Sequence, residues 1–104
     1  MTADGAQEFM FYLNVWLTVK EPTQVEKVAG LLASQVPLTR AEPGCVRFEV
    51  YHSEADARRF LLVECWQEKK DWETHRTAKA FTEIYAPQVL PLVDREPHIS
   101  TLVE

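Results

Sequence analysis

Three side chains in this sequence could bind or deprotonate a small ligand: Asn14, Trp66 and His75. His75 is the candidate general base, because an imidazole titrates near neutral pH. Trp66 can donate its indole N–H to a substrate oxygen and stack on an aromatic ring. Asn14 falls within a strand pattern, where Asn is disfavoured, and a buried amide without a partner costs roughly 1–3 kcal/mol. We therefore expect Asn14 to hold a substrate oxygen.

Each of these residues also has a structural interpretation. His75 could cap or pack a helix bend, Asn14 could form a hydrogen bond across a subunit interface, and Trp66 could simply fill a core. The other histidines, His52 and His98, lie at a loop edge and a strand start and are expected to be solvated. Seven further residues are predicted to line the ligand site, with core or interface packing as the alternative: Tyr12, Trp16, Arg47, Tyr51, Leu62, Glu64 and Tyr85.

Alternating patterns predict the strands that carry these residues. In residues 9–20 every odd position is apolar, which is typical of a strand with one face on a core. Residues 45–52 form a second predicted strand, with Val46, Phe48 and Val50 toward the core. In residues 59–66 we expect Leu61, Val63 and Cys65 to face the core. Phe60, Leu62, Glu64 and Trp66 would then face the other way, placing Glu64 near Arg47 as an ion pair. Residues 98–103 read as the last strand.

Two helical regions separate these strands. Thr23 and Glu26 fit a capping box at the start of the first helix, and Pro37 is expected to end or kink it. Its apolar stripe is Val25, Val28, Ala29, Leu32 and Val36. The second region, from Glu68 to about Val93, should bend near Thr77.

The resulting β-α-β-β-α-β order predicts a ferredoxin-like α+β fold with both helices on one face of a four-stranded antiparallel sheet. Residues 1–8 are expected to be a flexible lead-in, and residues 9–104 a single domain. The open sheet face would carry large apolar side chains, which a monomer does not usually leave in water. We therefore expect a homodimer that pairs sheet to sheet and encloses a cavity, forming a dimeric α+β barrel.

Composition excludes several functions. The net charge is −5 and basic residues occur at most in pairs, so nucleic acid and membrane are not expected partners. No Cys and His spacing indicates a zinc site, and three scattered glycines form no phosphate loop. The N-terminus lacks a basic region followed by an apolar run. A cytoplasmic protein is expected, with Cys45 and Cys65 as free thiols because they are placed on opposite sheet faces.

The sequence resembles the antibiotic biosynthesis monooxygenase domain family, within the dimeric α+β barrel superfamily. The matching segments are EPGCVRFEVY (residues 42–51), RFLLVECWQEKKDWETH (59–75) and AFTEIYAPQVLP (80–91). They contain the family's Pro-Gly-Cys turn at residues 43–45, its Glu-x-Trp at residues 64–66, and a His nine residues after the Trp, here His75. The resemblance extends from Phe9 to Val103.

This resemblance implies oxidation of a small phenol, quinol or anthrone by O₂ without metal, flavin or haem. His75 would accept the proton or orient the anion, while Asn14 and Trp66 would hold substrate oxygens. One departure is Ala80, which stands where many relatives carry a second His.

The superfamily also includes other activities, so three alternatives stay open. The protein could be an isomerase or a non-catalytic binding module on the same barrel. Haem degradation is disfavoured, because Tyr85 stands where haem-degrading relatives place a ligand His, and His75 where they place a Trp.

Overall fold

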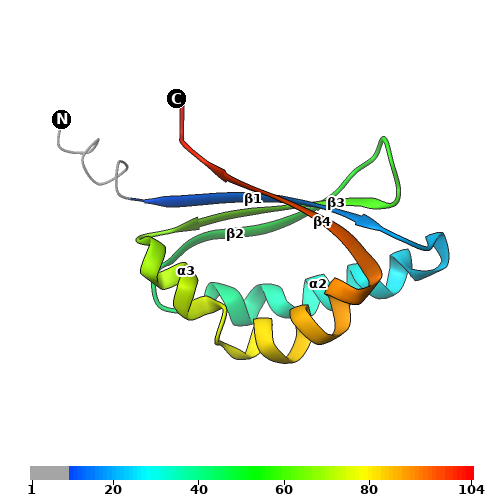
Figure 1. Ribbon diagram of the computed structural model, residues 1–104, viewed down its shortest axis with the longest axis horizontal. Coiled ribbons are helices and arrows are strands. Elements are labelled where there is room, and N and C mark those ends of the chain that lie inside the picture. Colours follow the sequence, from blue (N-terminus) through cyan, green and yellow to red (C-terminus); the bar gives the residue numbers. More distant parts are fainter. Residues whose placement is uncertain (1–9) are drawn as a thin grey trace.

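The computed structural model describes residues 10–104, so the predicted lead-in and Phe9 lie outside the described part. Four strands and several helices follow in the predicted order (Figure 1). The strands are β1 (Phe11–Val19), β2 (Cys45–His52), β3 (Arg59–Trp66) and β4 (Val93–Ser100). The helical segments are η1 (Pro22–Gln24), α2 (Val25–Arg40), α3 (Lys69–His75), the π-helix η2 (Ala80–Val89) and η3 (Leu90–Leu92).

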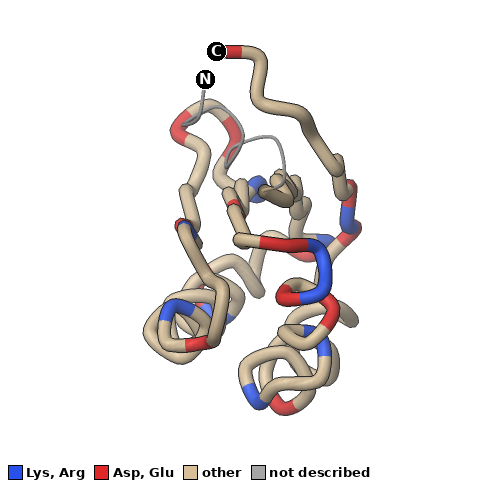
Figure 2. The backbone as a smooth tube through the Cα atoms, turned by 90° about the vertical axis from the view of Figure 1, so that its left-hand side faces the viewer, with Lys and Arg blue, Asp and Glu red and all other residues tan. Residues whose placement is uncertain are grey.

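The strands form one antiparallel sheet in the order β2-β3-β1-β4. The helices cover one face of this sheet, and the opposite face is open within residues 10–104 (Figures 1 and 2). This arrangement confirms the predicted ferredoxin-like α+β fold. Figure 2 also shows acidic and basic residues mixed along the helices and β4 rather than gathered by sign.

The core lies between the sheet and the helices. The odd positions of β1, from Phe11 to Val19, are all buried there, as the alternation predicted. Val28 and Leu32 of α2 pack on them, with Val25, Ala29 and Val36 partly buried beside them. Burying a large aliphatic side chain contributes about 1.5–3 kcal/mol, so this layer holds α2 on the sheet.

The boundaries of α2 differ from the prediction. Thr23 lies inside the short 3₁₀ segment η1, and no side-chain hydrogen bond caps either η1 or α2. Pro22 in the first turn of η1 starts the segment instead, because its missing N–H is not needed there. Pro37 does not end the helix, which continues to Arg40.

The two faces of β3 are the reverse of the prediction. Trp66 lies opposite Phe11, Glu64 opposite Leu13, and Leu62 opposite Val15. Directly opposite residues share a sheet face, so Phe60, Leu62, Glu64 and Trp66 face the helices, and all four are buried. Leu61, Val63 and Cys65 therefore face the open side. Both faces of β3 are rich in apolar residues, so alternation defined the two sets without showing which one meets the helices.

A bulge in β2 also alters the predicted core. The register with β3 shifts between Cys45 and Arg47, leaving Val46 as the extra residue. Val46 is consequently exposed, whereas Phe48 is buried and Val50 partly buried, as predicted. Cys45 pairs with Trp66 and packs on the core, while Cys65 lies on the open face. The two thiols are free, as expected.

The C-terminal part bends where the sequence indicated. α3 ends at His75, and the hydroxyl of Thr77 donates to the carbonyl of Thr74 at 2.6 Å, closing the helix end. η2 begins at Ala80, three residues after Thr77. β4 starts at Val93 and ends at Ser100, so it begins earlier than the predicted segment 98–103. It is an edge strand, which is why it can contain Pro97.

Candidate functional site

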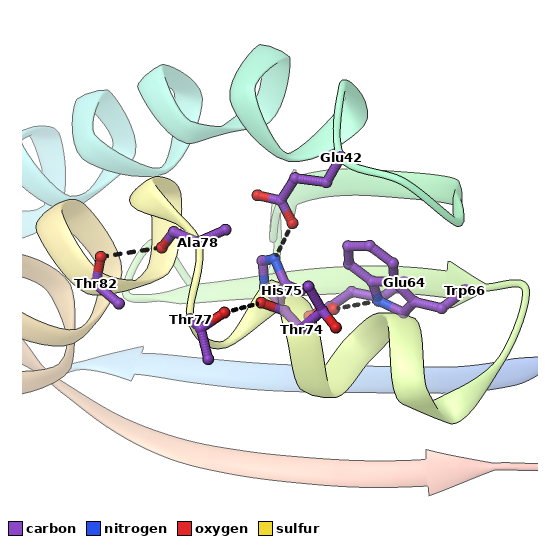
Figure 3. Close-up of polar contacts among 8 residues, drawn as sticks. All are labelled: Glu42, Glu64, Trp66, Thr74, His75, Thr77, Ala78 and Thr82. Carbon is purple, nitrogen blue, oxygen red and sulfur yellow. Dashed lines mark hydrogen bonds and ion pairs between the residues drawn. The ribbon is translucent and has the colours of Figure 1, made fainter.

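His75 is held by a carboxylate inside the protein. Its Nδ1 lies 2.6 Å from Oε1 of Glu42, and its side chain is only 5% exposed (Figure 3). A carboxylate oxygen can only accept a hydrogen bond, so Nδ1–H of His75 is the donor and Oε1 of Glu42 the acceptor. Among residues 10–104, no side chain or carbonyl bonds to Nε2 of His75. Nε2 is therefore the ring nitrogen that the Glu42 contact leaves without a partner among the described residues.

The turn before β2 positions both members of this pair. Glu42 follows the end of α2, and its N–H donates to the carbonyl of Thr39. Gly44 then turns the chain with φ of 81°, in the left-handed region that favours glycine. Asp71 of α3 packs directly against Gly44 and accepts the N–H of Glu68 at 3.1 Å, as part of a capping box. The turn thus anchors the first turn of α3, one helical turn before His75.

The next two residues of the site, Trp66 and Glu64, lie on β3. The Trp66 ring is centred 4.8 Å from that of His75, and its indole N–H donates to Oε1 of Glu64 at 3.0 Å (Figure 3). Burial raises the pKa of Glu64, against the opposing effects of the Trp66 hydrogen bond and the charges of His75 and Arg95. The buried Glu64 carboxyl therefore keeps its proton up to a higher pH than an ordinary glutamate does.

η2 adds aromatic side chains on the helix side. Phe81 meets His75 edge to face at 5.7 Å, and Tyr85 lies 5.3 Å from Phe81. Tyr85 is buried, and its hydroxyl accepts a hydrogen bond from Nε of Arg95 on β4 at 3.2 Å. Burial raises the pKa of this phenol, which Arg95 partly opposes. The π-helical geometry of η2 is rare in proteins and often occurs at functional sites.

The predicted site residues fall into two groups on opposite sides of the sheet. Trp66, His75, Leu62, Glu64 and Tyr85 lie on the helix side, where all of them are buried. Asn14, Tyr12 and Trp16 lie on the open side with Arg47 and Tyr51. The expectation that Asn14, Trp66 and His75 meet is therefore wrong for Asn14. Its amide instead donates to the Ser100 hydroxyl at 3.2 Å.

The predicted Arg47–Glu64 ion pair is also absent from the described residues. Glu64 lies beneath the helices, whereas Arg47 points to the open side and pairs with Glu49 at 2.9 Å. The Tyr51 hydroxyl donates to the same carboxylate at 2.6 Å. The reversed faces of β3 separate the two predicted partners, because Arg47 lies on the open face as predicted whereas Glu64 does not.

Two functional candidates were missed from the sequence, namely Glu42 and Arg95. Glu42 was interpreted only as part of a turn, although its position directly before the Pro-Gly-Cys motif was a usable signal. Arg95 precedes Glu96 in a charged run that resembles a solvated loop. Its contact with Tyr85 depends on the earlier start of β4, which no periodic pattern indicated.

Two surface hollows lie away from His75. A groove of about 560 Å³ follows the edge between α2 and β2, lined by residues that include Ala33, Pro37 and Tyr51. A basin of about 640 Å³ lies on the open face and includes Asn14, Tyr12 and Arg47. Neither is lined by Glu42, His75, Trp66 or Tyr85. Within residues 10–104, no three His, Cys, Asp or Glu side chains are grouped as metal ligands, and no helix is long and apolar enough to cross a membrane.

Solved structures share the fold over almost the whole chain. A conserved protein of unknown function from Bacteroides thetaiotaomicron superposes with a TM-score of 0.83 at 21% identity, covering 90% of this chain and 98% of that one. A Nitrosomonas europaea protein named as a candidate antibiotic biosynthesis monooxygenase has a TM-score of 0.83 at 22% identity, covering 90% of each chain. A Shewanella oneidensis protein is 26% identical, with a TM-score of 0.73 and coverage of 88% and 91%.

Sequence comparison identifies both a curated relative and the family. An uncharacterised protein from Synechocystis is 27% identical over 63 residues, which is 61% of this chain but only 43% of that protein. The chain thus spans less than half the length of this curated relative. The profile of the antibiotic biosynthesis monooxygenase family matches residues 10–87, which include the Gly44 turn, Trp66 and His75. The chain belongs to the antibiotic biosynthesis monooxygenase family.

Proposed function

We propose that the protein is a cofactor-independent monooxygenase that oxidises a small phenol, quinol or anthrone-like substrate with O₂. The observation that carries this proposal is the buried His75–Glu42 pair, with its Nδ1–Oε1 distance of 2.6 Å, packed against Trp66. Family membership supports a monooxygenase-type or small-ligand-binding role. The reacting site is proposed on the helix side of the sheet, not in the barrel cavity that the sequence suggested.

The geometry is suited to removing a substrate proton. A substrate hydroxyl or activated C–H would give its proton to Nε2 of His75, and Glu42 would stabilise the imidazolium that forms. The resulting anion can transfer one electron to O₂. Recombination of the superoxide with the substrate radical forms a C–O bond. The His75 imidazolium returns its proton to the peroxide, and loss of the hydrogen on the same carbon as the O–O bond breaks leaves a carbonyl on the substrate and releases water, so one oxygen atom of O₂ enters each product.

The surrounding side chains have defined parts in this proposal. Phe81, which is partly exposed, offers aromatic surface to a flat substrate, and the buried Trp66 packs behind the His75 ring, since both rings lie within 6 Å of it. Tyr85 stays protonated at neutral pH because burial raises its pKa, so its hydroxyl can donate to reduced oxygen. Its bond from Arg95 fixes the direction of that hydroxyl.

We also propose that the open sheet face pairs two copies of the chain. Tyr12, Trp16, Leu61 and Val63 are only partly buried there, and Tyr51 is exposed. Asn14 and Arg47 then become interface groups, which is the structural alternative considered for Asn14. Val63→Asp should convert the dimer to a monomer in sedimentation velocity, because it places a charge in the middle of the face. Glu54→Lys in the exposed β2–β3 loop is the matched control.

Oxygen uptake tests the catalytic proposal. The metal-free protein would be assayed with a panel of quinols and anthrones, and general-base catalysis commonly contributes 10²–10⁴-fold. His75→Gln should lose about that factor, and Glu42→Gln a smaller one, because its amide still accepts the Nδ1 hydrogen bond. His98→Ala, which alters an exposed histidine on β4, is the control. Full activity of His75→Gln would refute the assignment.

An isomerase is the second candidate, because a His–Glu pair can move a proton without oxygen. Ala80, where many relatives carry a second His, removes one acid–base group and favours the simpler chemistry or ligand binding alone. Anaerobic incubation in D₂O separates the candidates. Exchange or isomerisation without O₂, dependent on His75, would favour the isomerase. Binding without any conversion in either atmosphere would favour a binding module.

A further inference from the structure

Two sulfur atoms meet on the open face of the sheet, on the side opposite His75. Cys65 of β3 lies directly across from Tyr12 of β1, and its thiol donates toward the thioether of Met10 with an Sγ–Sδ distance of 3.7 Å. The Tyr12 hydroxyl also donates toward the Met10 sulfur, at 3.8 Å. Met10, Tyr12 and Cys65 thus form a sulfur-rich cluster that takes no part in the proposed oxidation.

The cluster is within reach of a small ligand. All three residues line the open-face basin of about 640 Å³. Met10 and Tyr12 are partly exposed, and Cys65, although only 5% exposed, contributes to the wall of the basin. An ion that enters the basin can therefore approach both sulfur atoms.

The geometry of the two sulfurs is suited to one metal ion. Thiolate and thioether sulfurs are the soft ligands that Cu⁺ prefers. Because a metal–thiolate bond is about 2.3 Å long, one ion can bond to both sulfurs at their present separation of 3.7 Å with an S–metal–S angle of about 107°. That angle is ordinary for a coordinated metal, so neither side chain has to move far to bind it.

The ligand set and the surroundings favour Cu⁺ over Zn²⁺. Structural zinc sites usually have four ligands from Cys, His and carboxylates, and the described residues contain no group of three such side chains. Cu⁺ binds with fewer ligands. A Cu⁺ ion bonded to one thiolate also carries no net charge, so it loses less hydration energy in a basin whose walls include Val46 and Val63.

We propose that Met10 and Cys65 form a binding site for Cu⁺, with the Tyr12 hydroxyl donating a hydrogen bond to the bound thiolate. Binding breaks the S–H bond of Cys65, forms an S–Cu bond and releases one proton, while copper keeps its oxidation state. Burial raises the pKa of this thiol, and the Tyr12 hydrogen bond and the charge of Arg47 act in the opposite direction. The ion must therefore displace a proton at neutral pH.

Competition with a coloured chelator tests this site. The reduced, metal-free protein would receive Cu⁺ as its bathocuproine disulfonate complex without O₂, and the loss of colour measures transfer. Since the site lies on the face proposed to pair, Cu⁺ is supplied both to the folded protein and during refolding from urea. We expect one Cu⁺ per protomer, with an apparent affinity that rises about tenfold per pH unit near neutrality because one proton is released.

Four variants identify the ligands. Cys65→Ser should abolish the transfer. Met10→Leu keeps an apolar side chain of similar size and should weaken binding about tenfold or more, and Tyr12→Phe should weaken it about tenfold. Cys45→Ser is the matched control, because it removes the other free thiol, which packs on the core. This control should still take one Cu⁺ per protomer.

Every outcome bears on the proposal. If the original protein takes no Cu⁺, or if Cys45→Ser loses as much binding as Cys65→Ser, the sulfur contact is packing only and the site is refuted. Unchanged affinity in Met10→Leu would show that Cys65 acts alone, which also refutes a two-sulfur site. Met10→Leu keeps the thiol, so it decides the question even if Cys65→Ser fails to fold. Oxygen uptake is measured on metal-free protein, so this inference and the proposed function fail by different measurements.

Discussion

Replacing Gly44 with alanine should destabilise the protein and displace the helix that carries His75. Gly44 has a φ of 81°, and a Cβ at this position would overlap the side chain of Asp71. A left-handed conformation costs an L-residue roughly 1–2 kcal/mol. Moving Asp71 also weakens the capping box at the start of α3, which is worth about 1 kcal/mol. We expect Gly44→Ala to lower the free energy of unfolding by about 2–3 kcal/mol, out of a typical 5–15 kcal/mol.

Urea denaturation monitored by tryptophan fluorescence measures this loss, since Trp66 and Trp72 lie near the turn and α3. Gly30→Ala is the matched control, because Gly30 is exposed within α2 and an added Cβ there meets nothing within 4 Å. That change should stabilise the protein by about 0.5–1 kcal/mol. The two substitutions are chemically identical and are expected to have opposite signs.

A double-mutant cycle tests the cause. Asp71→Ala removes the carboxyl atoms nearest to the new Cβ but keeps the Cβ of residue 71, which would lie 2.6 Å from it, so Gly44→Ala should cost less in that background without becoming neutral, with a coupling of about 0.5–3 kcal/mol. Additive effects would show that the carboxyl group of Asp71 is not responsible. A loss below about 1 kcal/mol for Gly44→Ala alone would refute the reasoning about the turn altogether.

Three further predictions concern the buried Glu64, its hydrogen-bond donor Trp66, and the partly buried thiol of Cys45. Because burial raises the pKa of Glu64, its folded form holds a proton more strongly than its unfolded form. Its contribution to stability is therefore full below the ordinary glutamate value of 4.5 and is lost as pH rises through the raised value. The Glu64→Gln variant should lack this decline. Its free energy of unfolding, measured by urea titration, should therefore increase relative to that of the original protein between pH 4 and 7. If the two free energies change in parallel with pH, the reasoning is wrong. Trp66→Phe removes the N–H that donates to Glu64 and should cost roughly 1–3 kcal/mol at pH 7 by the same assay, and an unchanged midpoint would show that the bond contributes nothing. Burial, with the nearby Glu42 and Glu64 carboxylates, raises the pKa of Cys45 to about 11. At pH 8 only about one thiol in a thousand is then ionised, so iodoacetamide should label Cys45 slowly in the native protein and quickly in urea; rapid native labelling located by mass spectrometry would refute this.

The sequence predicted the fold well because its strongest signals are periodic. The odd positions of β1 and the stripe of α2 identified the two surfaces that form the core. The faces of β3 could not be assigned in the same way. Glu64 and Trp66 were assigned to the open face, yet the Glu64 carboxyl is buried beneath the helices and accepts a hydrogen bond from the indole of Trp66.

The candidate site was predicted only in part. Trp66 and His75 were identified and do meet, but the partner of His75 is Glu42, 33 residues earlier in the chain. A contact between a turn and a helix end leaves no periodic trace in a sequence. Asn14 appeared to belong with them because the assumed faces of β3 placed Trp66 on the open side, and reversing those faces separates the two residues across the sheet.

The composition of β4 limits how copies of this chain can associate. As an edge strand, β4 would normally offer free backbone groups to a strand from another molecule, the first step toward fibres. Pro97 has no N–H to offer, and Asp94, Arg95 and Glu96 just before it carry charges that an added strand would have to accommodate. Extension of the sheet across this edge is therefore discouraged. The same sequence that admits face-to-face pairing thus protects the protein against open-ended assembly at β4.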